Sequence, residues 1–345
     1  MPVGPTNSLL DVAGVGLGHA TVVRDEPPPP AGRGIARTGV TVIDLGGDAW
    51  AAPIPAGGAV LNGAGECTGF LTVREWGLIE TPIFLTSTMQ VGRVYDAACR
   101  LLLAEQPAIA DDVIIPVVAE CDDSHLNDCR AMQVEDADVA AALAAARAST
   151  GSGAAPEQGS VGAGTGMICL GFSGGIGTSS RVTAGGHTVG VLLLTNFGSQ
   201  ERLTVDGVRV GRLLPGSGTQ PPRPAGSCIG VAVTDAAVDS AGCARLARRI
   251  GLGLARTGST AHHGSGEIFL GVATGLRAPR GRRAPGPPLT GAELDSLFDG
   301  VVEATEEAVL ASLVASPTIL GRDGNSAVGL PVEAVRRLLG GHRHG

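Results

Sequence analysis

The sequence predicts an α/β protein in which strands and helices alternate along a chain of 345 residues. Two observations lead to that prediction. Apolar runs of strand length recur between stretches of helical periodicity, and hydrophobic residues make up 43% of the chain although aromatic residues make up only 3%. A chain of this length and composition buries a large core of Ala, Val, Leu and Ile, as one large α/β domain or as two ordinary ones.

Six apolar runs have the length expected of strands with at least one buried face. They lie at residues 40–45, 113–118, 167–172, 188–194, 228–233 and 268–273. Helical patterns fall between them, at 91–103, 134–147 and 241–254. The order of these segments gives the alternation on which the fold class rests.

Two further helices are predicted in the last third of the chain. Thr290 and Glu293 have the spacing of a capping box, which opens a helix to about residue 313. Pro331 at a first helical position, with Gly340 and Gly341 past the end, frames a final short helix. Four stretches rich in Pro, Gly and Ser are predicted to be exposed loops, at 24–34, 149–159, 215–226 and 277–288.

Charge and composition exclude several classes of protein. The formal net charge is −8, and the 25 basic residues are spread along the chain, which argues against a nucleic-acid partner. All 25 are arginine, because the sequence contains no lysine. The chain therefore has no P-loop lysine, no pyridoxal Schiff base and no Ser-Lys dyad.

The cysteines and the hydropathy pattern predict a soluble cytoplasmic protein. The chain has seven cysteines, an odd number, and none of them forms a Cys-x-x-Cys motif, as expected in a reducing compartment. The amino terminus lacks a charged n-region, and no window reaches eighteen uninterrupted apolar residues. We expect neither a membrane partner nor a nucleic-acid partner.

Two serines stand at the beginnings of predicted strands. Ser227 follows a proline-rich loop and opens the run at 228–233, so a chain break before it would make it both a nucleophile and a new amino terminus. About forty residues later, Ser265 opens the run at 268–273, with Glu267 two positions on and hence on the same strand face. A serine at such a boundary is otherwise an ordinary turn residue.

Polar groups also end two of the predicted strands. Glu120, Asp122 and Asp123 follow the run at 113–118, where carboxylates either bind a cation, recognise a substrate amine or face solvent. Asn196 ends the run at 188–194, where its amide is placed to donate to a developing oxyanion or to form a turn.

Two other constellations are weaker. Ser173 lies in a Gly-x-Ser-x-Gly segment, the pattern of an α/β-hydrolase nucleophile, but we expect a glycine-rich loop after it, where a helix is required. The pairs His262/His263 and His342/His344 lack the spacing of metal ligands. We therefore predict no metal site and no cofactor.

Motifs spread over nearly the whole chain resemble the L-aminopeptidase/D-esterase family of self-processing serine aminopeptidases, which includes the β-peptidyl aminopeptidases. The matching segments are 11–19, 61–63, 81–86, 162–166, 174–181, 226–235 and 256–269. The family resemblance implies an αββα four-layer sandwich, similar to the amino-terminal-nucleophile hydrolases but with different connectivity. It also implies a single peptidase domain over 1–345, assembly into a homo-oligomer, and self-cleavage between Gly226 and Ser227 into an α chain of 1–226 and a β chain of 227–345.

The resemblance further implies roles for the site residues. Ser227 is expected to be the nucleophile, with its own α-amine, whose unperturbed pKa is about 8, as general base. Asn196 is expected in the oxyanion hole, Ser265 beside the nucleophile, and Glu267 orienting Ser265. Glu120 corresponds to the carboxylate that receives the free amino group of a small peptide or amide substrate.

Two positions depart from the family pattern. Asp122 stands where many relatives carry a tyrosine that contributes to the oxyanion hole, and Ser173 stands where relatives often carry lysine. Both departures remove a polar donor near the expected site. They leave two alternatives to a self-processing aminopeptidase: a non-catalytic binding or assembly module that keeps the fold, and a conventional α/β hydrolase that uses Ser173.

Overall fold

The structure, a computed structural model, describes residues 1–216 and 226–342. The prolines of the predicted loop ahead of Ser227, at 221, 222 and 224, lie outside the described residues, as do Arg343 and His344.

Two β-sheets form the centre of the molecule. The smaller has the strand order β1 (Gly16–Asp25), β2 (Ile35–Asp44), β5 (Ile83–Ser87), β6 (Val117–Cys121). The larger has the order β4 (Leu78–Ile79), β3 (Ile54–Gly63), β12 (Gly266–Ala273), β11 (Ser227–Thr234), β10 (Thr188–Asn196), β9 (Gly175–Val182). Two short hairpins complete the strands, β7 (Ile168–Cys169) with β8 (Phe172–Ser173), and β13 (Ile319–Leu320) with β14 (Ser326–Ala327).

The α-helices of the described chain range from one turn to 24 residues. They are α1 (Phe70–Trp76), α2 (Val91–Glu105), α3 (Asp136–Ser149), α4 (Val210–Leu213), α5 (Ser240–Arg256), α6 (Ala292–Ala315) and α7 (Val332–His342). Short 3-10 turns lie at Leu9–Asp11, Thr88–Gln90, Pro107–Asp111, Gly162–Gly164, Gln200–Arg202, Thr274–Leu276 and Arg322–Gly324. No helix within 1–216 or 226–342 is long and apolar enough to cross a membrane.

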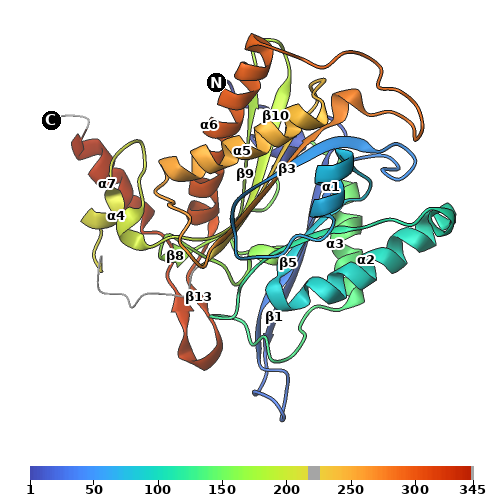
Figure 1. Cartoon of the computed structure of the whole chain (residues 1–345). Helices are drawn as coiled ribbons and strands as arrows, with labels where there is room; N and C mark the ends of the chain where they lie inside the picture. Colours follow the sequence, from blue (N-terminus) through green and yellow to red (C-terminus); the bar gives the residue numbers. More distant parts are fainter. Residues whose placement is uncertain (217–225, 343–345) are drawn as a thin grey trace.

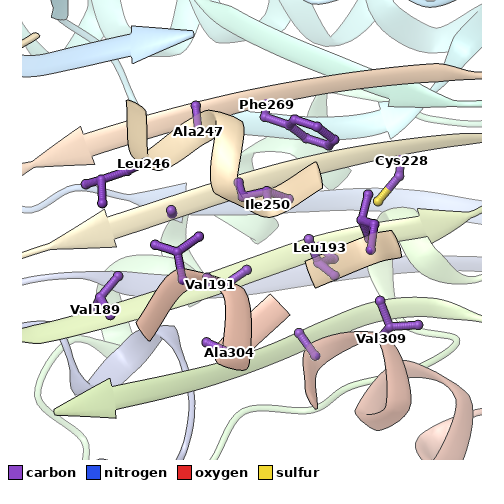
Figure 2. Close-up of a cluster of buried hydrophobic side chains, with 14 of the residues drawn as sticks. Val189, Val191, Leu193, Cys228, Leu246, Ala247, Ile250, Phe269, Ala304 and Val309 are labelled. Carbon is purple, nitrogen blue, oxygen red and sulfur yellow. The ribbon is translucent and has the colours of Figure 1, made fainter. Parts of the chain in front are cut away.

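Three apolar clusters show that the elements form four layers. Side chains of α5, α6 and the larger sheet share one cluster, and side chains of α2, α3 and the smaller sheet share another. The third cluster lies between the two sheets and includes Leu85 of β5, Leu194 of β10 and Val231 of β11. Figure 1 shows α5 and α6 on one side of the sheets and α2 and α3 on the other. Figure 2 shows the first cluster, in which Val191 and Leu193 of β10 face Ile250 of α5 and Val309 of α6.

β11 is the strand that positions the site. All eight of its residues are buried, because the second sheet covers one of its faces and helices cover the other. A run that is apolar on both faces is typical of such a central strand. Helix α5 follows β11 and returns the chain to β12, which pairs with β11 in parallel. Asp239 caps α5 by accepting a hydrogen bond from the Gly242 amide at 2.8 Å.

The predicted strands at 40–45, 188–194, 228–233 and 268–273 are confirmed as parts of β2, β10, β11 and β12. The strand predicted at 113–118 begins later, at Val117, because Pro116 lacks the amide that a ladder needs and Val113 is 77% exposed. The run at 167–172 is a hairpin, not one strand. Leu170 and Gly171 both have positive φ, 48° and 80°, which turns the chain between β7 and β8.

The glycine-rich segment after Ser173 is strand β9 rather than a loop. A Cβ on Gly177 would lie 1.9 Å from the carbonyl oxygen of Ala308 in α6, so glycine there allows the helix to approach the strand. The helices predicted at 91–103, 134–147 and 241–254 are confirmed as α2, α3 and α5 within a few residues.

Two predicted helix ends are wrong. Helix α6 begins at Ala292 after Gly291, which makes no side-chain capping bond, so the capping box of Thr290 and Glu293 does not form. Helix α7 continues through Gly340 and Gly341 to His342 instead of ending before them. Glycine lowers helix propensity but does not end a helix that still has an apolar face to pack.

Candidate active site

Ser227 lies at the first position of β11, between two partner strands. Its backbone pairs with Asn196 of β10 on one side and with Gly266 of β12 on the other. The side chain is 6% exposed, and its Oγ accepts a hydrogen bond from the Gly266 amide at 3.3 Å. Residues about 30 and 40 positions away in the sequence are thereby brought to both sides of one hydroxyl.

Ser265 and Glu267 flank that amide. The Ser265 hydroxyl donates to Oε1 of Glu267, and both side chains are buried. The other oxygen, Oε2, has no hydrogen-bond partner in the part of the chain that the structure describes. Burial raises the pKa of Glu267, and the bond from Ser265 opposes that shift. The hydrogen bond to Ser227 Oγ thus comes from the Gly266 amide, while Glu267 holds Ser265.

Asn62 of β3 fixes the turn before Ser265. Its side-chain amide donates to the carbonyl oxygens of Ser265 at 2.6 Å and His262 at 2.8 Å. Asn62 also pairs with Glu267 across the sheet, next to a register shift between Glu267 and Ile268. Irregular pairing of this kind re-aims side chains beside active sites. Asn62 therefore helps to set the position of Ser265 against Ser227.

The amide of Asn196 is held at both ends. Its Oδ1 accepts from the Ile168 amide at 2.9 Å, and its Nδ2 donates to the carbonyl oxygen of Asp122 at 2.8 Å. Nδ2 carries two hydrogens, so one remains for a ligand. Asn196 borders a pocket of about 180 Å³ that Gly226 also lines. A fixed amide donor that shares a pocket with Gly226 and pairs with Ser227 is placed as an oxyanion donor would be.

Glu120 approaches the same end of β12 from the smaller sheet. Its buried carboxylate accepts from the Glu66 amide at 2.9 Å and from the Thr88 hydroxyl. A Cβ on Gly65 would lie 3.2 Å from Glu120 Oε1 and 3.6 Å from Gly266 Cα, so only glycine backbone separates this carboxylate from Gly266. Burial raises the pKa of Glu120, and the hydrogen bonds from Thr88 and the Glu66 amide oppose that shift.

The carboxylates that follow β6 do not converge on one point. Asp122 is exposed, and its carboxylate accepts from the amide and the hydroxyl of Ser124 at 2.8 and 3.0 Å. Asp123 is buried and accepts from Ser87 Oγ at 2.8 Å and Asn127 Nδ2 at 3.0 Å. Burial raises the pKa of Asp123 to about 6. Glu120 and Asp122 are grouped together in the sequence because they are two positions apart. In the structure Glu120 is buried, whereas Asp122 is exposed.

Metal ligation finds no support in the described ranges, 1–216 and 226–342, where no group of three His, Cys, Asp or Glu side chains is placed to hold an ion. His262 and His263 are both exposed. The side chain of His342 and the whole of His344 lie outside the described part of the chain.

Ser173 is not placed as a nucleophile. It is fully buried in β8, its amide donates to the Val328 carbonyl oxygen, and its hydroxyl bonds to Ser160 Oγ at 3.1 Å. Strand β9 follows it, so the strand-turn-helix context of a nucleophile elbow is absent.

Several residues around the site were not assigned by the sequence. Asn62, Glu66 and Thr88 touch it through loops or strand ends that carry no local pattern. Asn62 lies within a family-matching segment, which was the one available signal. Strand pairing and packing between distant segments, which no spacing rule reveals, bring Asn62 to Ser265 and bring Glu66 and Thr88 to Glu120.

Known proteins share both the sequence and this architecture. Residues 7–327 match the sequence profile of peptidase family S58. A β-peptidyl aminopeptidase of Sphingosinicella xenopeptidilytica is 38% identical over 356 residues, which span 97% of this chain and 87% of that protein. A β-aminopeptidase structure from Burkholderia sp. is 40% identical with a TM-score of 0.86, covering 97% of this chain and 95% of that one.

A third relative carries the fold comparison. The L-aminopeptidase D-Ala-esterase/amidase of Ochrobactrum anthropi, described as a prototype of the serine aminopeptidases and a variant of the Ntn-hydrolase fold, is 32% identical with a TM-score of 0.89. The match covers 99% of this chain and 95% of that structure. The predicted four-layer sandwich is thus confirmed. This chain belongs to peptidase family S58 and is a serine aminopeptidase that hydrolyses peptide or amide bonds.

Proposed function

We propose that the chain cleaves itself before Ser227 and then uses that residue, as an amino-terminal nucleophile, to remove amino-terminal residues from small peptides, amides or esters. The position of Ser227 carries the proposal: its hydroxyl lies at the open end of the central strand, between Asn196 and the Gly266 amide. The products would be an α chain of 1–226 and a β chain of 227–345, within one peptidase domain.

The self-cleavage step follows from that position. Ser227 Oγ attacks the carbonyl carbon of Gly226, the Gly226–Ser227 C–N bond breaks, and the released nitrogen takes up the hydroxyl proton. Water then hydrolyses the resulting ester, which leaves a carboxylate on Gly226 and a free α-amine on Ser227. Gly226 fits this role because a Cβ there would lie 1.6 Å from the Asn196 carbonyl oxygen, so the residue is pressed against β10.

Turnover reuses the same groups. The α-amine of Ser227, with a pKa of about 8 when unperturbed, takes the proton from Oγ as Oγ attacks the substrate carbonyl. The remaining Nδ2 hydrogen of Asn196 stabilises the oxyanion. The α-amine then protonates the leaving amine, and water attacks the acyl-enzyme in the reverse sequence. Ser265, held by Glu267, keeps the Gly266 amide aimed at Oγ.

Glu120 is the proposed receptor for the substrate's free amino group. Its carboxylate lies beside Gly266 and is held by Thr88 and the Glu66 amide, which fixes its direction. A second carboxylate, that of Glu66, lies close enough for its negative charge to raise the pKa of Glu120. A positively charged ammonium group beside Glu120 lowers the repulsion between the carboxylates of Glu120 and Glu66, which favours substrates with a free amino terminus.

We propose that the substrates include peptides that begin with a β-amino acid, since relatives at 38% and 40% identity are named for that activity.

The proposed mechanism needs no metal or organic cofactor. We further propose a homo-oligomer of αβ units. A cytoplasmic location agrees with the seven cysteines, all of which are unpaired.

A second candidate, a binding or assembly module without turnover, rests on Asp122. This exposed residue lines the pocket that also contains Asn196 and Gly226, at the position where relatives supply a tyrosine donor. Its carboxylate accepts hydrogen bonds from the amide and hydroxyl of Ser124, while the Asn196 side chain donates to the backbone carbonyl oxygen of Asp122 and not to that carboxylate. That arrangement favours the aminopeptidase over the module.

A matched pair of substrates tests the proposed function. An amino-terminal β-alanyl or L-alanyl anilide should be hydrolysed, and its N-acetylated counterpart should not, because acetylation removes the charge that Glu120 receives. Glu120→Gln should raise the KM for the free amine more than tenfold, as expected for loss of a buried charge-assisted contact. Glu75→Gln, an exposed position on α1, is the control. Equal hydrolysis of both anilides would contradict the assignment of Glu120.

A further inference from the structure

A second, basic pocket lies outside the site described above. Its volume is about 460 Å³, and it lies between the segment after β10 and the end of α5. Its walls carry Arg202, Arg209 and Arg212, together with the hydroxyl residues Ser259 and Thr260. The three arginines make this hollow basic in a protein whose formal net charge is −8.

The three arginines carry more positive charge than the pocket itself neutralises. All are exposed, and none forms an ion pair with any residue of 1–216 or 226–342. By contrast, many arginines elsewhere are paired, such as Arg181 with Glu307. The carboxylate in the pocket wall is Glu201, whose pKa is lowered by the hydrogen bond from Ser199 and also by the charge of Arg202, so it offsets one of the three charges. Two net positive charges therefore remain for a ligand.

Guanidinium groups suit a carboxylate ligand. Each presents a planar fork of N–H donors that matches the two oxygens of a carboxylate. The hydroxyl groups of Ser259 and Thr260 add neutral donors on the same wall. The pocket thus has the donor set of a site for a small oxyanion.

Both segments that form the pocket lead directly from the catalytic site. Arg202 is six residues after Asn196, and Ser259 is six residues before Ser265. Since consecutive Cα atoms are 3.8 Å apart, each is within about 23 Å of its catalytic neighbour. An extended peptide of up to roughly six residues can therefore reach from the catalytic site to the pocket.

We propose that the arginine pocket binds the carboxy-terminal carboxylate of the substrate's leaving peptide. The inference rests on the proposed function, and it narrows the substrate class to short peptides with two free ends. Glu120 would receive the amino terminus and the arginines the carboxyl terminus. Peptides with a blocked carboxyl terminus, and long chains whose end lies out of reach, would be poorer substrates.

Matched peptides test this inference. One set has leaving groups of one to six residues with a free carboxylate, and the other has the same sequences as carboxamides. For the wild-type protein we expect kcat/KM to favour the carboxylate by about tenfold at the best length, with a preference that weakens as salt increases. The double variant R202Q/R212Q should lose the preference through a higher KM for the carboxylate only.

Arg100→Gln is the control, because Arg100 is an exposed helical arginine on α2, which packs against the smaller sheet on the opposite side of the molecule from α5. It should leave the preference unchanged. The inference is overturned if the wild-type protein hydrolyses carboxylate and carboxamide equally at every length, or if R202Q/R212Q slows both sets alike.

A binding measurement separates this inference from the proposed function. Calorimetry with the leaving peptide alone, as carboxylate and as carboxamide, needs no turnover. If neither set is hydrolysed, the proposed function fails, yet carboxylate-selective binding that R202Q/R212Q abolishes would still support the pocket. Inorganic phosphate is the second ligand: if phosphate binds to the arginines and the peptide carboxylate neither binds nor competes with it, the pocket is a site for a free anion and the inference is wrong.

Discussion

The Gly266 amide points at Ser227 Oγ across the first residues of two parallel strands, at 3.3 Å. Because α5 joins these strands on one face of the sheet, their first residues lie at the same edge. On the other side of Ser227, the antiparallel strand β10 ends at Asn196. The proposed nucleophile, positioning amide and oxyanion donor thus belong to three neighbouring strands of one sheet, which limits their relative movement.

Gly226→Ala should slow self-cleavage about a hundredfold, the scale expected when a reacting carbonyl is displaced by about 1 Å. The new Cβ would lie 1.6 Å from the Asn196 carbonyl oxygen and 2.6 Å from its carbon, both backbone atoms that cannot move aside freely. The fraction of cut chain over time, followed by denaturing electrophoresis, measures the effect.

Gly92→Ala is the matched control, since a Cβ at that position would meet no atom within 4 Å apart from its chain neighbours and the backbone of its own helix. It should process at the wild-type rate. Processing of Gly226→Ala at the same rate as Gly92→Ala would mean that the scissile carbonyl is not held against β10.

Asn196→Ala should lower kcat by a factor of about 10² to 10³, as for the loss of one oxyanion donor, with a smaller change in KM. Asn325→Ala provides the comparison, because Asn325 lines the same pocket and donates to the His125 carbonyl oxygen at 2.8 Å. It should change kcat little. If the two variants lose kcat equally, the loss comes from the pocket wall and Asn196 has no special role.

Asp123→Asn should flatten the dependence of stability on pH. The carboxyl of Asp123 has a folded pKa of about 6 against an ordinary value of 3.8, so the folded state holds its proton more tightly. Between these values the folded state binds more protons than the unfolded state, and the free energy of unfolding falls as pH rises. The change amounts to about 3 kcal/mol.

The measurement is urea unfolding at pH values from 4 to 7, with and without Asp123→Asn, in a Ser227→Ala background intended to keep each protein a single chain. Glu120 and Glu267 are present in both proteins, so the difference isolates Asp123. The wild-type residue should lose stability relative to asparagine as pH rises, and the difference should level off above pH 6. Parallel curves would show that Asp123 is not protonated preferentially in the folded state.

The sequence predicted the strands of the site because they are uniformly apolar. β10, β11 and β12 each lie between two layers, and a run buried on both faces is visible without knowing its partners. β9 was missed because it is rich in glycine, which lowers strand propensity, although Gly177 is what allows α6 to approach the strand closely. The start of β6 was displaced because the apolar run continues across Pro116.

The site itself was predictable only in part. Ser227, Ser265 and Glu267 could be singled out because each stands near the start of an apolar run. The contact of Glu120 with Gly65, and of Asn62 with Ser265, depends on pairing and packing between segments far apart in the chain. Asp122 and Asp123 come directly after β6, which ends at Cys121, so strand alternation no longer fixes where they point, and each accepts hydrogen bonds from a different partner.

The most direct test of the account is denaturing mass spectrometry of the purified wild-type protein beside its Ser227→Ala variant. The account predicts two fragments in the wild type, meeting between Gly226 and Ser227, and one intact chain in the variant. A wild-type chain that stays uncut for days under conditions where it is folded would contradict self-processing and favour the binding module.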